Sequence, residues 1–136
     1  MMEGLTFLSR KPRRGDVVVF KTDGIAALPP ATFYVKRIAG EPRDRLRISS
    51  GKLYVNDQQV AINNKTGEIH YVFLPGSTYL TSSNDTATVP DGHYFVLRDN
   101  SGNSADSRIW GFLPSKNVMG RISFCFWPPQ SVGAVR

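Results

Sequence analysis

The chain has 136 residues and a mass of 15.1 kDa, the size of one domain with a core of its own. Its 40% content of hydrophobic residues excludes wholesale disorder, and no apolar run approaches the ~20 residues that span a bilayer. We therefore expect the chain itself to be soluble. The net charge of +6 suits an anionic partner such as a membrane surface, but the basic segment Arg10–Arg14 lacks the interleaved aromatic residues of nucleic-acid-binding segments. We expect no nucleic acid partner.

Neither a disulfide nor a metal site is predicted. The single cysteine, Cys125, has no partner for an intramolecular bond, and together with the distant His70 and His93 it cannot supply the ligands of a zinc site. Cys125 lies between two phenylalanines, as a small hydrophobic residue of a strand does. We expect no cofactor.

Short apolar strands separated by turn residues dominate the chain, and helical periodicity is almost absent. The pattern predicts an all-β fold, a compact curled antiparallel sheet or partial barrel. We expect a single domain over residues 1–136, with its core at about 12–41 and 89–130 and a β-rich insertion at about 42–88. Polar loops are expected at 63–68 and 82–88. The expected strands are residues 16–21, 32–38, 45–48, 53–55, 70–74, 94–97 and 120–127.

One strand carries a lysine in an apolar setting. In TFYVKRI, residues 32–38, alternation places Tyr34 and Lys36 on one face and Val35 and Arg37 on the other. Both faces then carry a cation, so at least one of the two must be shielded or paired. Lys36 is either a solvent-facing residue of an edge strand or a desolvated amine whose pKa is low enough for a general base.

The most unusual segment is DNSGNSADSR, residues 99–108, in which Ala105 is the only apolar side chain. Asp, Asn, Ser and Gly favour turns, so one interpretation is a solvated hairpin loop. The other is an ordered loop, because the apolar residues IWGF follow at once and would pack over Arg108. In that case Arg108 needs a carboxylate partner, and Asp106 is the candidate.

Three segments in order carry a family resemblance: RGDVVVF (14–20), YVKRIAG (34–40) and DNSGNSADSR (99–108). VPDGHYFVL (89–97) and WGFLP (110–114) support it. Together they strongly resemble type I signal peptidases, over nearly the whole chain from residue 12 onward. The resemblance implies a membrane-anchored serine endopeptidase with a Ser-Lys dyad, which removes N-terminal signal peptides from exported proteins. It also implies a catalytic region on the outer face of the bacterial cytoplasmic membrane, with signal peptides and the membrane surface as partners.

The resemblance assigns roles to individual residues. Lys36 matches the general base, and Ser104 matches the hydroxyl that orients it. Tyr34 and Val35 fall on the strand beside which an extended substrate is expected to lie. A charged group that holds the polar loop and the base strand together is matched by Arg37, Asp99, Asp106 and Arg108.

Lys36 can deprotonate a serine near neutral pH only if an apolar setting destabilises its ammonium form. A hydroxyl such as that of Ser104 fixes the amine without adding charge, whereas a carboxylate beside it would raise the pKa of the lysine. We expect the apolar setting from Phe20, Phe33, Tyr34 and Val35.

The chain departs from the family pattern in three places. Arg43 and Arg98 stand where the family has glycine, and either is strained if its φ is positive. The family nucleophile is a serine in a Ser-Met motif upstream of the Arg-Gly-Asp segment, and nothing in this sequence matches it. Ser9 is followed by Arg10 and lies too close to that segment. We therefore expect this chain to supply the base and the scaffold without the nucleophile, and to be inactive alone.

Two alternatives remain at this point. A non-catalytic homologue would bind extended peptides or a membrane-complex partner through the same sheet. The other alternative is a related processing peptidase of conjugation systems.

Overall fold

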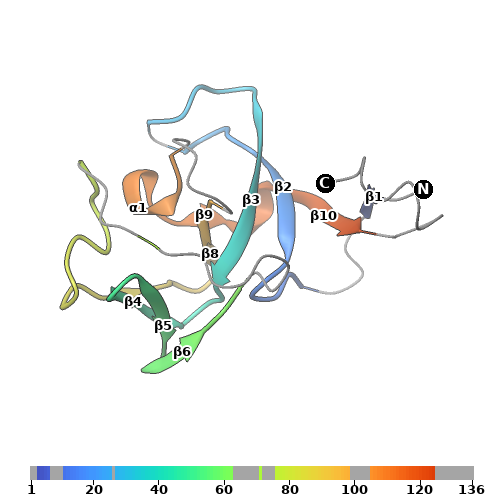
Figure 1. Cartoon of the computed structure of the whole chain (residues 1–136). Helices are drawn as coiled ribbons and strands as arrows, with labels where there is room; N and C mark the ends of the chain where they lie inside the picture. Colours follow the sequence, from blue (N-terminus) through green and yellow to red (C-terminus); the bar gives the residue numbers. More distant parts are fainter. Residues whose placement is uncertain are drawn as a thin grey trace.

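The computed structural model describes residues 3–6, 11–25, 27–62, 71, 76–98 and 105–124. In this part of the chain, strands dominate and the only helices are two short ones, α1 (Ser107–Trp110) and the 3-10 helix Ser115–Asn117 (Figure 1). The strands pair in antiparallel fashion and form two sheets. The predicted all-β class with antiparallel sheets is confirmed.

The large sheet has six strands, and its order differs from the order in the chain because the last strand lies between the first two. From edge to edge the strands are β1 (Glu3–Thr6), β10 (Val118–Phe124), β2 (Val17–Lys21), β3 (Phe33–Gly40), β8 (His93–Leu97) and β9 (Leu113–Pro114).

The small sheet has four strands and lies beside the C-terminal end of β3 (Figure 1). Its strands all come from residues 45–60 and 87–88, the range expected for the insertion. In spatial order they are β6 (Gln58–Val60), β5 (Lys52–Val55), β4 (Arg45–Ser49) and β7 (Ala87–Thr88).

Strands β3 and β8 contribute to both hydrophobic clusters. Because side chains of a strand alternate between faces, Tyr94 and Val96 enter one cluster while Phe95 and Leu97 enter the other. The first cluster, called here the β3 core, contains the buried residues Val18, Phe20, Ile25, Ile38, Tyr94, Val96, Trp110 and Leu113. The second cluster joins β8 to the small sheet through residues such as Ala39, Leu46, Ile48, Leu53, Val55 and Val89.

Most of the expected strands are confirmed to within two residues at each end that the structure describes. The expected strand at 70–74 lies outside the described residues except for Tyr71, as do the last residues of the one expected at 120–127. The sequence did not predict the short elements β1, β6, β7 and β9 or helix α1, which are too brief to show a periodicity.

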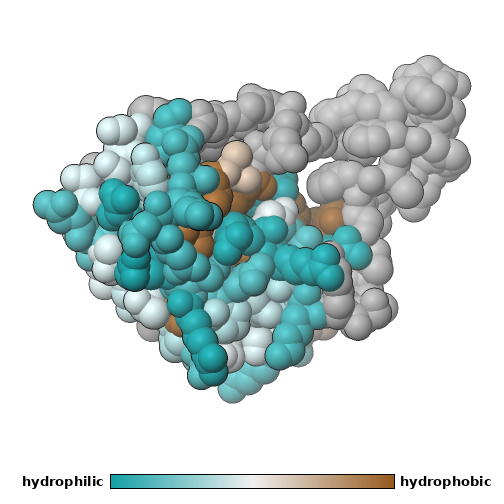
Figure 2. Space-filling model, turned by 90° about the horizontal axis from the view of Figure 1, so that it is seen from below, coloured by the Kyte–Doolittle hydropathy of each residue, from teal (hydrophilic) through white to brown (hydrophobic). Residues whose placement is uncertain are grey.

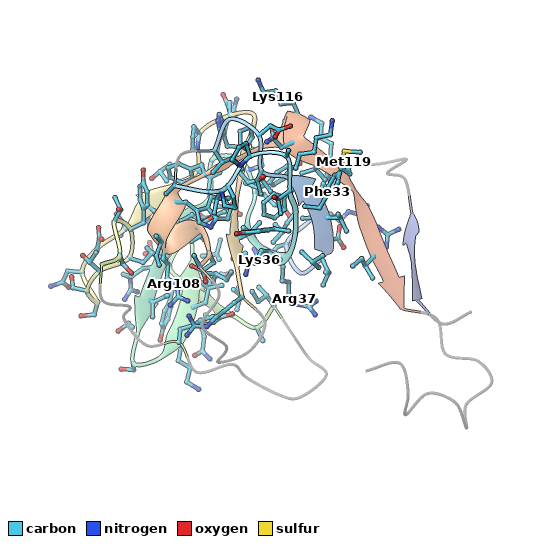
Figure 3. The ribbon with its side chains drawn as sticks, turned by 90° about the horizontal axis from the view of Figure 1, so that it is seen from above. Phe33, Lys36, Arg37, Arg108, Lys116 and Met119 are labelled. Carbon is cyan, nitrogen blue, oxygen red and sulfur yellow. The ribbon has the colours of Figure 1, made fainter. Side chains whose placement is uncertain are left out.

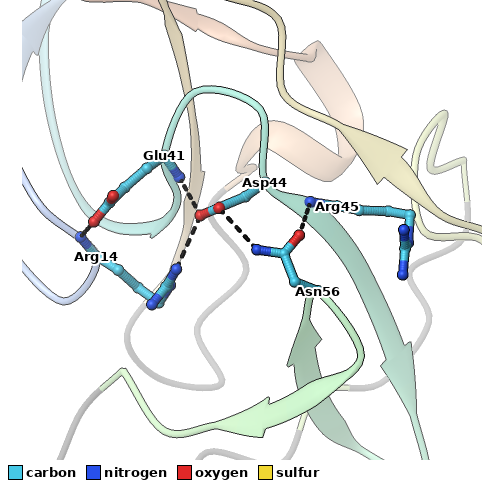
Figure 4. A network of polar contacts seen from close by, with 5 residues as sticks. All are labelled: Arg14, Glu41, Asp44, Arg45 and Asn56. Atoms are coloured by element: carbon cyan, nitrogen blue, oxygen red, sulfur yellow. Dashed lines mark hydrogen bonds and ion pairs between the residues drawn. The ribbon is translucent and has the colours of Figure 1, made fainter.

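A buried carboxylate fixes the turn that leads from β3 into the small sheet (Figure 4). Asp44 accepts hydrogen bonds from the backbone nitrogen of Glu41 at 2.9 Å, from Arg14 Nη2 at 3.0 Å and from Asn56 Nδ2 at 3.2 Å. Glu41 in turn accepts from the backbone nitrogen of Arg14, and Asn56 Oδ1 accepts from that of Arg45. The entry to β2, the end of β3 and the β4–β5 hairpin are thereby held together.

The same turn forces one residue into the left-handed region. Arg43 has φ 75°, so the first of the two positions where the family has glycine is strained in this chain. Arg98 is not among the described non-glycine residues with positive φ. Arg43 Nε donates to Asp91 Oδ1 at 2.8 Å, but both side chains are exposed, so this ion pair contributes little stability.

Replacing Arg43 should therefore test the backbone strain. Glycine adopts this φ freely while alanine does not, so we expect Arg43→Gly to be more stable than Arg43→Ala by about 1 kcal/mol. Both variants lose the ion pair with Asp91, so their difference isolates the backbone effect. Urea denaturation measures both free energies of unfolding, and an alanine variant as stable as the glycine variant would contradict the strain.

Candidate functional site

Lys36 lies on the buried face of β3 (Figure 3). Only 8% of the residue is exposed. Its register partner on β2 is Val18, which is fully buried, and the next pair on that face is Phe20 with Tyr34. The Nζ atom lies 5.9 Å from the centre of the Tyr34 ring. Lys36 is therefore not a solvent-facing lysine, and the β3 core surrounds its aliphatic stem.

The expectation that Phe33 and Val35 shield Lys36 is wrong. The period of two along β3 places both on the opposite face of the sheet, where they are 59% and 49% exposed. Of the residues expected to provide the apolar setting, Phe20 and Tyr34 do so, with their rings edge to face at 6.2 Å.

Sequence reasoning missed one residue that shields Lys36. Val18 faces Lys36 across the β2–β3 ladder. The alternation of RGDVVVF could have predicted this contact of Val18, because residues on one face of a strand pack beside residues on the same face of the neighbouring strand. Trp110, also missed, packs against Phe20 with 5.7 Å between ring centres and so extends the apolar cluster.

Asp106 and Arg108 form an ion pair in which both side chains are completely buried. Asp106 Oδ2 accepts from Arg108 Nη2 at 2.8 Å and from the backbone nitrogen of Arg98 at 3.1 Å. Its Oδ1 accepts from Arg108 Nε and from the Arg108 backbone nitrogen, both at 3.0 Å. The last of these bonds makes Asp106 the N-cap of α1. The described end of the polar segment is thus ordered, not a solvated loop.

Arg108 also joins α1 to the segment that precedes β7. Its guanidinium carbon lies 5.6 Å from the centre of the Tyr71 ring. Its backbone oxygen accepts from the backbone nitrogens of Thr78 at 2.9 Å and Tyr79 at 3.0 Å. Arg108 is therefore held by Asp106 in its own segment and by Tyr71, Thr78 and Tyr79 from the segment before β7.

The remaining residues of the expected charged group are placed differently. Arg37 alternates with Lys36 and donates from Nη1 to the backbone oxygen of Gly15 at 2.7 Å, so it links β3 to the turn before β2. Asp99 and Ser104 lie outside the described residues. The structure thus brings Asp106 and Arg108 together, and places Arg37 on the other face of the strand that carries Lys36.

Burial lowers the pKa of Lys36, and two neighbouring charges modify this effect. The negative charge of Asp106 raises the pKa, while the positive charge of Arg98 lowers it. A carboxylate near Lys36 is therefore present, contrary to the arrangement expected from the sequence. Both oxygens of Asp106 already accept hydrogen bonds from Arg108 or from the Arg98 backbone, so the charge of this carboxylate is largely neutralised. The pKa of Lys36 is therefore lowered overall.

On the β8 side of β3, the ladder between described strands stops short of Lys36. It begins at the pair Arg37–Leu97, whereas the ladder with β2 continues back to Phe33. Among the described strands, none pairs with residues 33–36 on the β8 side. Tyr34 is half-buried and Val35 is exposed in this part of β3. A strand edge of this kind can accept an additional strand.

Within the described residues, no three His, Cys, Asp or Glu side chains gather as metal ligands would. His93, in the same part of the chain, has its Nδ1 2.9 Å from the backbone oxygen of Asp91. Neither described helix has the length and apolar character needed to cross a bilayer.

Removal of the Asp106 carboxylate should be far more costly than its position in a Ser- and Gly-rich segment suggests. Asp106→Ala leaves Arg108 buried and unpaired, and we expect a loss of about 3–5 kcal/mol in the free energy of unfolding. The matched control is Asp91→Ala, which removes an exposed partner of Arg43 and should leave the free energy of unfolding almost unchanged. Guanidinium denaturation of both variants measures this difference, and equal midpoints would show that the buried pair adds nothing.

Comparison with known proteins gives a consistent set of relatives. The family model described as signal peptidase, peptidase S26, matches residues 2–127. The chain is 37% identical to a probable signal peptidase I-2 of Synechocystis over 134 residues, which cover 98% of this chain and 56% of that protein. It is 36% identical to thylakoidal processing peptidase 1 of Arabidopsis thaliana over 138 residues, which cover 97% of this chain and 37% of that protein.

A solved structure resembles the fold as well. A signal peptidase I from Enterococcus faecalis superposes with a TM-score of 0.61 at 27% sequence identity, covering 84% of this chain and 98% of that one. The chain spans about half the length of the curated relatives it matches.

Proposed function

This chain belongs to the signal peptidase family, peptidase S26, and we propose that it supplies the general base of a serine endopeptidase. The proposed enzyme removes N-terminal signal peptides from exported proteins. The observation that carries the proposal is the state of Lys36. Lys36 is a lysine of which only 8% is exposed, and burial among apolar side chains lowers the pKa of its amine. A lowered pKa is what a lysine needs to act as a general base near neutral pH.

In the proposed reaction, the neutral Lys36 amine accepts the proton of a serine hydroxyl as that oxygen attacks the scissile carbonyl. The ammonium formed then gives a proton to the departing amine of the new N-terminus. The family's Ser-Met motif supplies the serine, and no position of this sequence matches it. Ser104 is proposed to orient the amine by its hydroxyl.

The charged group is proposed to hold the base in place. Asp106 caps α1 and binds the backbone of Arg98, so it joins the helix to the strand next to β3. Arg37 fixes the opposite face of β3 through Gly15. Asp99 is assigned to the same group by the family resemblance alone.

The β8 side of β3 at residues 33–36 is the proposed substrate site. An extended peptide that adds as a strand beside residues 33–36 would have its backbone fixed by Tyr34 and Val35 and its scissile bond next to Lys36. The exposed Val35 side chain offers a shallow apolar contact, which suits small residues in the substrate. The site is proposed to act at the outer face of the bacterial cytoplasmic membrane.

A chimera tests this function directly. The chain is inserted in place of the matching segment of the Synechocystis relative, and cleavage of a preprotein is followed by gel electrophoresis. We expect the chimera to release the signal peptide and the 136-residue chain alone to give no turnover. Lys36→Ala in the chimera should lower the cleavage rate by about 10²–10⁴-fold, the usual contribution of a general base.

Arg45→Ala is the matched control, because Arg45 is an exposed residue of the small sheet, paired with Asp57. It should leave cleavage unchanged. A chimera that binds the peptide without cleaving it would instead identify a non-catalytic peptide-binding homologue. Turnover that is insensitive to Lys36→Ala would overturn the assignment of the base.

A further inference from the structure

Arg98 follows directly after β8 and lies on the same face of the sheet as Lys36. Tyr94 and Val96 of β8 belong to the β3 core, while Phe95 and Leu97 belong to the other cluster. One further step of this alternation points Arg98 toward the β3 core. The residue is only 9% exposed, as that placement requires.

The β3–β8 ladder ends one residue before Lys36 and Arg98. Strands β3 and β8 pair Arg37 with Leu97 and Ile38 with Val96. Lys36 and Arg98 are the next residues in the same antiparallel direction, so although they are not a ladder pair they lie next to each other at its end, on the face that Ile38 and Val96 share. The Arg98 backbone is held there, because its nitrogen donates to Asp106 Oδ2 at 3.1 Å.

We propose that Arg98 is a positioning residue for Lys36, a buried like charge that keeps the lysine side chain in its neutral, proton-accepting form. A guanidinium stays protonated at any pH the protein experiences, so of two neighbouring buried cations the amine is the one that loses its proton. The importance of this effect for peptide cleavage rests on the proposed function, whereas the electrostatic coupling itself does not.

The other groups that face Lys36 do not supply the same effect. Asp106 acts in the opposite direction and is itself paired with Arg108. Tyr34 is uncharged and neighbours Lys36 on the same face. Arg121 on β10 pairs with Val18, so it lies two strands from Lys36, roughly 10 Å away. The lowering of the Lys36 pKa by burial is reinforced by Arg98, which agrees with the placement of the two cations.

This role is a property of this chain rather than of the family pattern, because the family has glycine at the position of Arg98. The positive charge of Arg98 opposes the pull of Asp106, which favours the ammonium form, and so offsets part of it.

Three substitutions separate charge from bulk. Arg98→Met removes the charge but keeps an unbranched apolar side chain, Arg98→Lys keeps the charge, and Arg98→Gly removes both. The titration midpoint of Lys36 is measured by NMR on the purified full chain with ¹⁵N-labelled lysine. We expect the midpoint to shift upward in the methionine and glycine variants. In the lysine variant we expect a smaller upward shift, because the introduced amine carries the same charge but can itself lose its proton. Arg98→Gln replaces the methionine variant if that variant does not fold.

Arg45→Met, on the exposed side of the small sheet, controls for the loss of one positive charge and should leave the midpoint in place. An Arg98→Met midpoint equal to that of the wild type would overturn the proposal. An upward shift in the glycine variant alone would also overturn it, since Arg98 would then act by excluding water. Because no substrate is present, the outcome is independent of whether the chain takes part in peptide cleavage.

Discussion

The completely buried ion pair between Asp106 and Arg108 is the interaction on which the site depends. Its carboxylate caps α1, binds the backbone next to β8 and neutralises a guanidinium that contacts the segment before β7. Two buried charges are expensive to desolvate, so the pair persists only because every oxygen of Asp106 and most donors of Arg108 have partners. The result is an ordered segment joined to the end of β8, although its composition suits a flexible loop.

Opposing effects act on the pKa of Lys36. The β3 core disfavours its charge, Asp106 favours it and Arg98 disfavours it again. The pKa of an amine placed in this way is sensitive to the charges of its neighbours. Under the proposed function, a substrate strand would add to β3 beside the same residue, so one short segment would supply both the base and the substrate contacts.

The sequence predicted the strands well because alternation and turn residues mark them, as in RGDVVVF and YVKRIAG. It also identified Lys36 as unusual and Asp106 as the partner of Arg108. The prediction failed where residues close in sequence lie on opposite faces of a strand. Phe33 and Val35 are near Lys36 in the sequence, but their side chains lie on the other side of the sheet. Arg98 could be placed beside Lys36 only through the β3–β8 register, which depends on contacts between residues about 60 positions apart.

The central claim is that the fold keeps the Lys36 amine desolvated and easily deprotonated. A pH titration of the ¹⁵Nζ signal of Lys36 in the wild-type chain measures this property most directly, with the same chain in urea as the reference. The account predicts a midpoint in the folded chain that lies below both the urea value and the ordinary ~10.4 of lysine. A folded midpoint at or above the urea value would show a solvated or carboxylate-stabilised ammonium and would contradict the account.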